Sequence, residues 1–139
     1  MKKIADTVIE LRIATRRACM CETQAGKKKS TLSLKTKVLY LVYNNCPARE
    51  IMLTLCIAKT NFAQIVAALI KDGLIVKSRA YDDRRSMRLT VTGKGRKYLS
   101  DCKNVIESNF KKAFSDEKSY SEAQRKLAEA LEVFSYIDI

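Results

Sequence analysis

Apolar residues recur at helical intervals along most of the chain. Between residues 59 and 72, Phe62, Ile65, Val66 and Leu69 follow the i, i+3, i+4, i+7 spacing of a helix with one buried face. The same kind of spacing predicts further helices over residues 4–22, 33–45, 48–56, 92–114 and 121–137. The pattern therefore predicts a mainly α-helical fold with about six helices.

Capping and turn residues separate these predicted helices. Ser33 can accept a hydrogen bond from a first-turn N–H of the second helix, and Pro47 suits the first turn of the third, where its missing N–H does no harm. Gly73 is expected at the C-terminal end of the fourth helix. Because only residues 56–58 connect the third and fourth helices, this pair is predicted to form a helix-turn-helix.

The hydrophobic period changes after Gly73. Residues 74–79 and 87–92 are rich in β-branched and apolar side chains, and the second segment alternates, so both are predicted as strands. The polar stretch 81–86 between them is predicted as the tip of a two-stranded hairpin, the wing.

Residues 24–30 are predicted as a glycine-containing loop. Its three consecutive lysines could touch phosphate, although such loops are more often only solvated.

Positive charge is concentrated in one part of the chain. The 139 residues include 27 basic and 15 acidic side chains, a formal charge of +12. Residues 75–97 contain eight basic and two acidic side chains, whereas residues 115–139 contain three basic and six acidic ones. This bias favours a polyanionic partner, and nucleic acid before an anionic membrane surface. No apolar run approaches the roughly 20 residues that span a bilayer, and no signal peptide is recognisable, so we expect a cytoplasmic protein.

The cysteine and histidine content argues against several kinds of site. The chain has no histidine, and no pair of its five cysteines has the C-x-x-C spacing of a zinc site. No glycine-rich phosphate loop, nucleophile–base pair or paired carboxylates are recognisable, so we expect neither an enzyme nor a bound metal or cofactor. Cys19 and Cys21 are candidates for a redox-sensing thiol. The more common alternative is a buried cysteine that acts as a small hydrophobic residue.

The polar face of the fourth predicted helix carries side chains that suit a major groove. Asn61 and Gln64 can pair bidentately with adenine edges, and Lys59 can donate to guanine or phosphate. Thr60 and Ala63 can contact a thymine methyl group. An ordinary amphipathic surface helix would carry similar residues. The basic hairpin that follows favours the interpretation as a recognition helix.

The predicted wing is rich in arginine. Its basic candidates for DNA contact are Arg79, Arg84, Arg85 and Arg88. A narrow minor groove concentrates negative potential that a guanidinium can enter, and we expect Arg85 to do so, held by a charge-assisted hydrogen bond that it donates to the Asp83 carboxylate. The alternative is a solvated cluster of salt bridges at the hairpin tip.

Three segments together resemble the MarR family of winged helix-turn-helix regulators. They are the stretch from Glu50 to Leu74, the triplet Asp83-Arg84-Arg85, and Val91-Thr92-Gly93-Lys94-Gly95. The first resembles the family's third helix, recognition helix and Gly-Leu exit. The other two resemble its Asp-x-Arg wing and its Leu-Thr-x-x-Gly entry to a long helix.

The resemblance implies a homodimer in which the first helix and the last two pack against their mates. It also implies a pseudo-palindromic double-stranded operator, with two recognition helices on the order of 34 Å apart. Arg85 would be the minor-groove residue and Asp83 its orienting partner. Ala58 stands where family members often have an Asp or Ser helix cap, which bears on how the recognition helix begins. Gln64 and Ala68 lie where they often place polar or basic DNA contacts, which bears on sequence preference and affinity.

We therefore expect a winged helix-turn-helix DNA-binding lobe over residues 33–92 and a helical dimerisation region over 1–30 and 93–139. The expected function is sequence-specific transcriptional regulation, as a repressor released by a small-molecule effector. Two alternatives stay open: a thiol-based redox-sensing regulator, and a winged-helix protein-interaction module without specific DNA binding.

Overall fold

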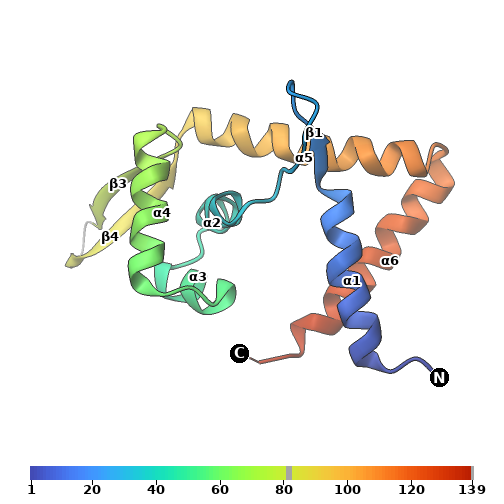
Figure 1. Cartoon of the computed structure of the whole chain (residues 1–139). Coiled ribbons are helices and arrows are strands. Elements are labelled where there is room, and N and C mark those ends of the chain that lie inside the picture. The colour runs from blue at the N-terminus through green and yellow to red at the C-terminus, as the bar shows by residue number, and fades with distance from the viewer. Residues whose placement is uncertain (81–82, 139) are drawn as a thin grey trace. The chain divides into compact units, whose positions relative to one another are not determined.

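The computed structural model describes the backbone of residues 1–80 and 83–138, and the side chains of this range except those of residues 80–87. The elements follow in the order α1 (Ile4–Ala18), β1 (Met20–Glu22), β2 (Lys28–Ser30), α2 (Leu34–Tyr43), α3 (Ala48–Leu55), α4 (Lys59–Lys71), β3 (Ile75–Ala80), β4 (Asp83–Val91), α5 (Gly93–Ala113) and α6 (Glu117–Ser135) (Figure 1). The fold is mainly helical with a small β-hairpin wing, which confirms the predicted class.

The chain forms two compact units. Unit 1 comprises Met1–Thr31 and Lys103–Ile139, and unit 2 comprises Leu32–Cys102. The boundary falls within α5, because Gly95 and Leu99 in its first turns are buried with unit 2.

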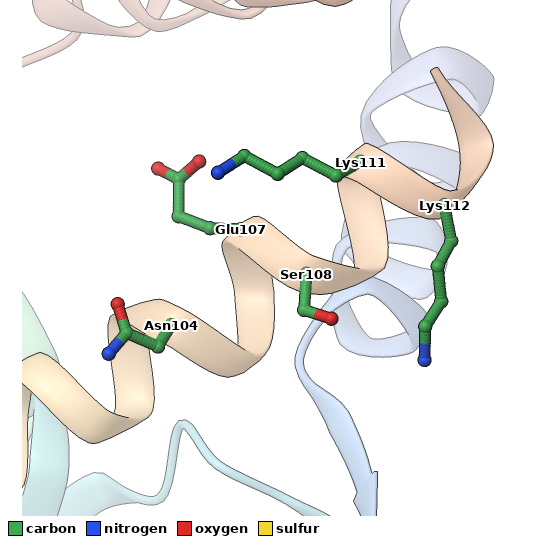
Figure 2. Close-up of a pocket in the computed structure, with 5 residues that line it drawn as sticks. All are labelled: Asn104, Glu107, Ser108, Lys111 and Lys112. Carbon is green, nitrogen blue, oxygen red and sulfur yellow. The ribbon is translucent and has the colours of Figure 1, made fainter. Parts of the chain in front are cut away.

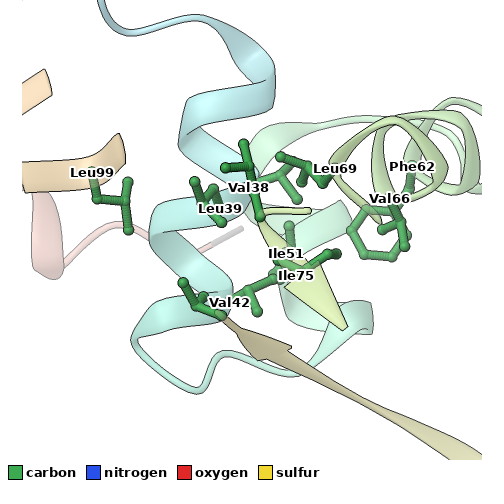
Figure 3. Packing of buried hydrophobic residues seen from close by; sticks show 11 residues of the cluster. Val38, Leu39, Val42, Ile51, Phe62, Val66, Leu69, Ile75 and Leu99 are labelled. Atoms are coloured by element: carbon green, nitrogen blue, oxygen red, sulfur yellow. The ribbon is translucent and has the colours of Figure 1, made fainter. Parts of the chain in front are cut away.

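The hydrophobic core of unit 2 draws on α2, α3, α4, the wing strands and the start of α5. Figure 3 shows this cluster of aliphatic side chains, with Phe62 at one side of it. Leu39, Ile51, Leu69 and Ile75 are almost fully buried at its centre. Burying a side chain of this size contributes about 1.5–3 kcal/mol, so the core orients every element that surrounds it.

Local interactions set where the helices of unit 2 begin and end, close to the positions that the sequence predicts. The Ser33 hydroxyl accepts a hydrogen bond from the Thr36 amide at 3.2 Å, which confirms the predicted N-cap of α2. Pro47 is the residue directly before α3. Gly73 follows α4 with a φ of 74°, and its amide bonds to the Ile70 carbonyl at 2.9 Å. This left-handed position favours glycine because it has no Cβ.

The wing is an antiparallel ribbon of β3 and β4. Ile75 pairs with Val91 and Arg79 with Met87, and the register shifts between Arg79 and Ala80. β4 already begins at Asp83, so most of the stretch predicted as the hairpin tip is strand instead. Residues 81–82 lie outside the described residues.

The sequence prediction for the first helix was wrong at its C-terminal end. The helix was expected to run to residue 22, but α1 ends at Ala18, and Met20–Glu22 pair with Lys28–Ser30 as an antiparallel hairpin. The Asn109 side-chain amide donates to the carbonyls of Ala18 and Met20, at 2.9 and 3.1 Å. These bonds come from a residue distant in the sequence, so the local pattern could not reveal them.

The last helix begins earlier than predicted. We expected a start near residue 121, but α6 starts at Glu117 because Asp116 caps it: its carboxylate accepts from the Ser119 amide at 2.8 Å. The Ser119 hydroxyl also donates to this carboxylate. That bond, followed by the one from the Ser119 amide, holds the pKa of Asp116 below its ordinary value.

Within the described residues, no single helix is long and apolar enough to cross a membrane. α3 and α4 together are long and apolar enough by length and composition, but they are bent by 114° relative to each other. Their apolar side chains Ile51, Phe62, Val66 and Leu69 belong to the core of unit 2.

Candidate nucleic-acid interface

α3 and α4 have the geometry of a helix-turn-helix. They meet at 114° across residues 56–58, within the range of about 90–120° that this motif shows. Cys56 ends α3 in the left-handed conformation with a φ of 53°, and the Ile57 amide bonds to the Met52 carbonyl at 3.1 Å. The turn therefore directs α4 across α3 without a glycine.

α4 is held by one face and exposed along the other. Phe62, Val66 and Leu69 are buried in the core of unit 2. The candidate base-reading residues are all exposed, and they are Lys59, Thr60, Asn61, Ala63 and Gln64. The structure thus brings the five predicted residues together on the first two turns of one helix.

The start of α4 has no side-chain cap. Ala58 occupies the N-cap position with an extended backbone and makes no capping hydrogen bond. The sequence departure at Ala58 therefore leaves the helix in place but leaves its first-turn N–H groups without the oxygen that serine or aspartate would offer.

The other end of α4 is anchored by residues that sequence reasoning missed. The Lys35 amine of α2 forms an ion pair with the Asp72 carboxylate, and the Lys94 amine of α5 donates to the Asp72 carbonyl at 2.9 Å. The hydrogen bond from Lys35, followed by its charge, holds the pKa of Asp72 below its ordinary value of 3.8. No spacing signal in the sequence links residues so far apart in the chain.

Thr92 joins the exit of α4 to the start of α5. Its hydroxyl donates to the Gly73 carbonyl at 2.6 Å and accepts from the Gly95 amide at 3.0 Å. Gly95 packs against the Leu74 backbone so closely that an added Cβ would lie 2.2 Å from the Leu74 carbonyl oxygen. In the Thr-x-x-Gly pattern of the sequence, the threonine therefore makes the hydrogen bonds at the start of α5, and the glycine allows the helix to pack closely against the wing.

The wing residues are only partly brought together. Arg79 and Arg88 are exposed, but the register pairs Arg79 with Met87 and Arg88 with Ser78. Successive residues of a strand point to opposite faces, so the two arginines lie on opposite faces of the ribbon. Asp83, Arg84 and Arg85 begin β4, and their side chains lie outside the described residues. The expected Asp83–Arg85 hydrogen bond stays a prediction.

The candidate redox cysteines differ in exposure. Cys19 is buried at the C-cap of α1, whereas Cys21 is half-buried in β1. Within the described residues, none of the five cysteines forms a disulfide. Burial, followed by the charge of Glu50, raises the pKa of the Cys46 thiol, which makes it less reactive. Among the described residues, no group of three or more potential ligands could hold a metal ion.

Two hollows lie in unit 1. One of about 420 Å³ is lined by Asn104, Glu107, Ser108, Lys111 and Lys112. All five belong to α5, and Figure 2 shows their side chains spreading outward from a single helix, so this is an open surface rather than an enclosed cavity. The other, of about 150 Å³, is a groove between α5 and α6 with Phe110, Tyr120 and Leu127 along it.

Comparison with known proteins identifies the family. Residues 37–95 match the model of a winged helix DNA-binding domain. The chain is 31% identical over 111 residues to the HTH-type transcriptional regulator BilQ of Clostridioides difficile strain CD3, covering 77% of this chain and 74% of that protein. A MarR transcriptional regulator from Methanosarcina mazei Go1 has a similar structure, with a TM-score of 0.62 and 22% identity over 93% of this chain and 94% of that one. The chain belongs to the MarR family of winged helix-turn-helix regulators.

The repressor CouR provides two further structural comparisons. CouR bound to a 23-mer DNA duplex matches with a TM-score of 0.64 and 23% identity, over 96% of this chain and 92% of that one. CouR from Rhodococcus jostii RHA1 bound to p-coumaroyl-CoA matches with a TM-score of 0.67 and 15% identity, over 99% and 95%. These likenesses show a shared fold. As a MarR-family member, the chain is a DNA-binding transcriptional regulator.

Proposed function

We propose that this MarR-family regulator is a homodimeric repressor. It would read a pseudo-palindromic duplex operator in the cytoplasm and release it when a small molecule binds. In this proposal residues 33–92 bind DNA, and residues 1–30 and 93–139 form the dimer. No catalytic step is part of it.

The exposed face of α4 carries the proposal. A helix held by one apolar face can place its other face in the major groove, which is about 12 Å wide. The amide side chains of Asn61 and Gln64 lie one turn apart on that face, both exposed, with Lys59 at the start of the helix. The small side chains of Ala63, Ala67 and Ala68 allow a close approach to base edges.

The wing supplies the second contact of the proposal. Arg85 would enter the minor groove, and the exposed Arg79 and Arg88 on opposite faces of the ribbon allow one of them to reach phosphate whichever face meets the duplex.

Exposed apolar residues in unit 1 support the homodimer. Neither α1 nor α6 buries a single residue within the chain. Ile4 of α1 is 84% exposed, and Leu131 and Val133 of α6 are 72% and 63% exposed. Apolar surface of this extent on a chain's terminal helices marks a protein interface, and a second copy is the partner that the family comparison suggests.

Release by a small molecule is supported by CouR, a repressor whose structure has been solved both with a DNA duplex and with p-coumaroyl-CoA. The half-buried Cys21 is the remaining support for a redox-sensing alternative. Peroxide treatment that leaves DNA affinity unchanged would remove that alternative.

The test is titration of the purified protein with its own promoter region. Asn61→Ala and Gln64→Ala should each cost about 1–3 kcal/mol at particular bases, because each loses a bidentate contact. Arg85→Ala should weaken binding to every duplex. Fluorescence anisotropy measures these affinities, first without and then with aromatic acids and their thioesters.

Asn104→Ala is the matched control, since this exposed amide lies on α5 in unit 1. It should bind like the wild type. The proposal fails if the wild type shows no preference for its promoter, or if the α4 variants bind as tightly as the control.

A further inference from the structure

We propose that the β1–β2 hairpin is a second DNA-contacting element, with Lys27, Lys28 and Lys29 bound to phosphates of the duplex that unit 2 reads. The inference rests on the proposed function and extends it, because the winged helix domain matched by the family model spans only residues 37–95.

The hairpin is an ordered structure, unlike the loop expected from the sequence. Met20 pairs with Ser30 and Glu22 with Lys28. The turn closes through a bond from the Thr23 amide to the Lys27 carbonyl at 2.8 Å, and Gly26 adopts a φ of 75°. Lysines on a paired backbone lose less conformational entropy on binding than lysines in a free loop.

The base of the hairpin is tied to its own unit on both sides. The Thr31 amide and hydroxyl donate to the Cys19 carbonyl, at 2.7 and 2.9 Å. Asn109 of α5 donates to the carbonyls on either side of Cys19. Figure 1 shows the hairpin and α1 extending from this junction in opposite directions.

The segment carries more basic than acidic side chains. Lys27, Lys28 and Lys29 are all exposed, and among the described residues none of them takes part in an ion pair. Arg16 and Arg17, also exposed, end the neighbouring helix. The hairpin contains a single acidic residue, Glu22, and adjacent like charges repel unless a polyanion is present. A row of phosphates supplies that charge.

The chain connects the hairpin closely to unit 2. Only Thr31, Leu32 and Ser33 separate β2 from α2, a connection that spans at most about 15 Å. One turn of duplex is about 34 Å long. A hairpin on so short a tether can reach phosphates near those that unit 2 contacts.

The experiment measures how salt weakens duplex binding. Wild-type protein and the variant K27Q/K28Q/K29Q are titrated, by anisotropy, with a random-sequence duplex of about 40 base pairs, roughly four helical turns. The plot of log K against log salt should have a slope shallower in the variant by about 1–3 for each protomer that contacts the duplex, since each lost phosphate contact removes about 0.9. Each lost contact makes the affinity loss between about 50 and 200 mM salt roughly 3.5-fold smaller.

Two further variants separate contact from net charge. K2Q/K118Q/K126Q removes the same charge from α6 and the N-terminus and should keep the wild-type slope. Replacing Lys27, Lys28 and Lys29 with arginine should keep it as well, because a guanidinium also binds phosphate. Circular dichroism confirms that each variant is folded.

The outcomes are distinct. A wild-type slope in the hairpin variant, or an equal loss in the K2Q/K118Q/K126Q control, overturns the inference and leaves the proposed function intact. No salt-dependent duplex binding by the wild type overturns both. If the hairpin variant loses binding to phosphatidylserine vesicles but keeps its duplex slope, the hairpin belongs to a lipid surface and the inference is overturned.

Discussion

Gly95 shows how one residue sets the junction between the wing and the long helix. It lies within the helix α5, where its backbone does not require glycine. An added Cβ, however, would meet the Leu74 carbonyl oxygen at 2.2 Å and the Val91 side chain at 2.7 Å. The sequence motif pointed to this glycine, whereas its physical reason, a close backbone contact with another element, needed the structure.

Gly95→Ala should destabilise the protein by about 1–3 kcal/mol, because backbone must shift to accommodate the methyl group. Chemical denaturation measures the free energy of unfolding. Gly93→Ala is the matched control: its Cβ would meet only the end of the Arg96 side chain at 3.6 Å. This control should be neutral or slightly stabilising, since alanine favours helix. Equal stability of the two variants would contradict the explanation.

At the scale of elements, α4 is held from both ends as well as from its buried face. Its N-terminal turn is set by the left-handed Cys56, and its C-terminal end by Lys35 and Lys94 acting on Asp72. The exposed face and the turn were predictable from hydrophobic spacing. The contacts of Lys35 and Lys94 with Asp72 join α2, α5 and the end of α4, and they could not be predicted from hydrophobic spacing.

Asp72→Asn should change how stability depends on pH. The pKa of Asp72 is lowered in the folded protein, so its contribution is present above the ordinary value of 3.8 and is lost as pH falls below it. The variant should therefore unfold at a lower temperature than the wild type at neutral pH, and the difference should vanish in acid. Thermal unfolding followed by circular dichroism across this range measures it.

Asp101→Asn is the control, because among the described residues this exposed carboxylate takes part in no ion pair. Its melting curve should follow the wild type at each pH. A pH-independent difference for Asp72→Asn would show that the carboxylate acts through packing and not through its charge.

At the scale of the whole molecule, unit 2 has a buried core and unit 1 largely does not. The described helices of unit 1 meet through contacts such as the Tyr120 hydroxyl donating to the Glu107 carboxylate, which raises the pKa of Tyr120. Phe110 and Phe114 stack with ring centres 6.4 Å apart. The apolar side chains of α1 and α6 nevertheless remain exposed, and the proposed homodimer would bury them.

Leu131→Glu should shift the protein from dimer to monomer, because a charge would have to enter an apolar interface. Sedimentation velocity measures the mass, and the wild type should sediment at twice the mass of the chain. Ser121→Glu, an exposed polar position on the same helix, is the control and should leave the dimer intact. A wild type that sediments as a monomer would contradict the dimer outright.

The sequence by itself determined the helix order, the helix-turn-helix, the wing and the polar face of α4, because these depend on periodicity and capping within short stretches. The tertiary structure alone decided where α1 ends, that Met20–Ser30 form a hairpin, and how Asp72 and Gly95 position α4 and α5. These features depend on contacts between residues far apart in the chain. Asn109, for example, donates a hydrogen bond to the Ala18 carbonyl, where α1 ends. The two residues are 91 positions apart, so no local pattern encodes this contact.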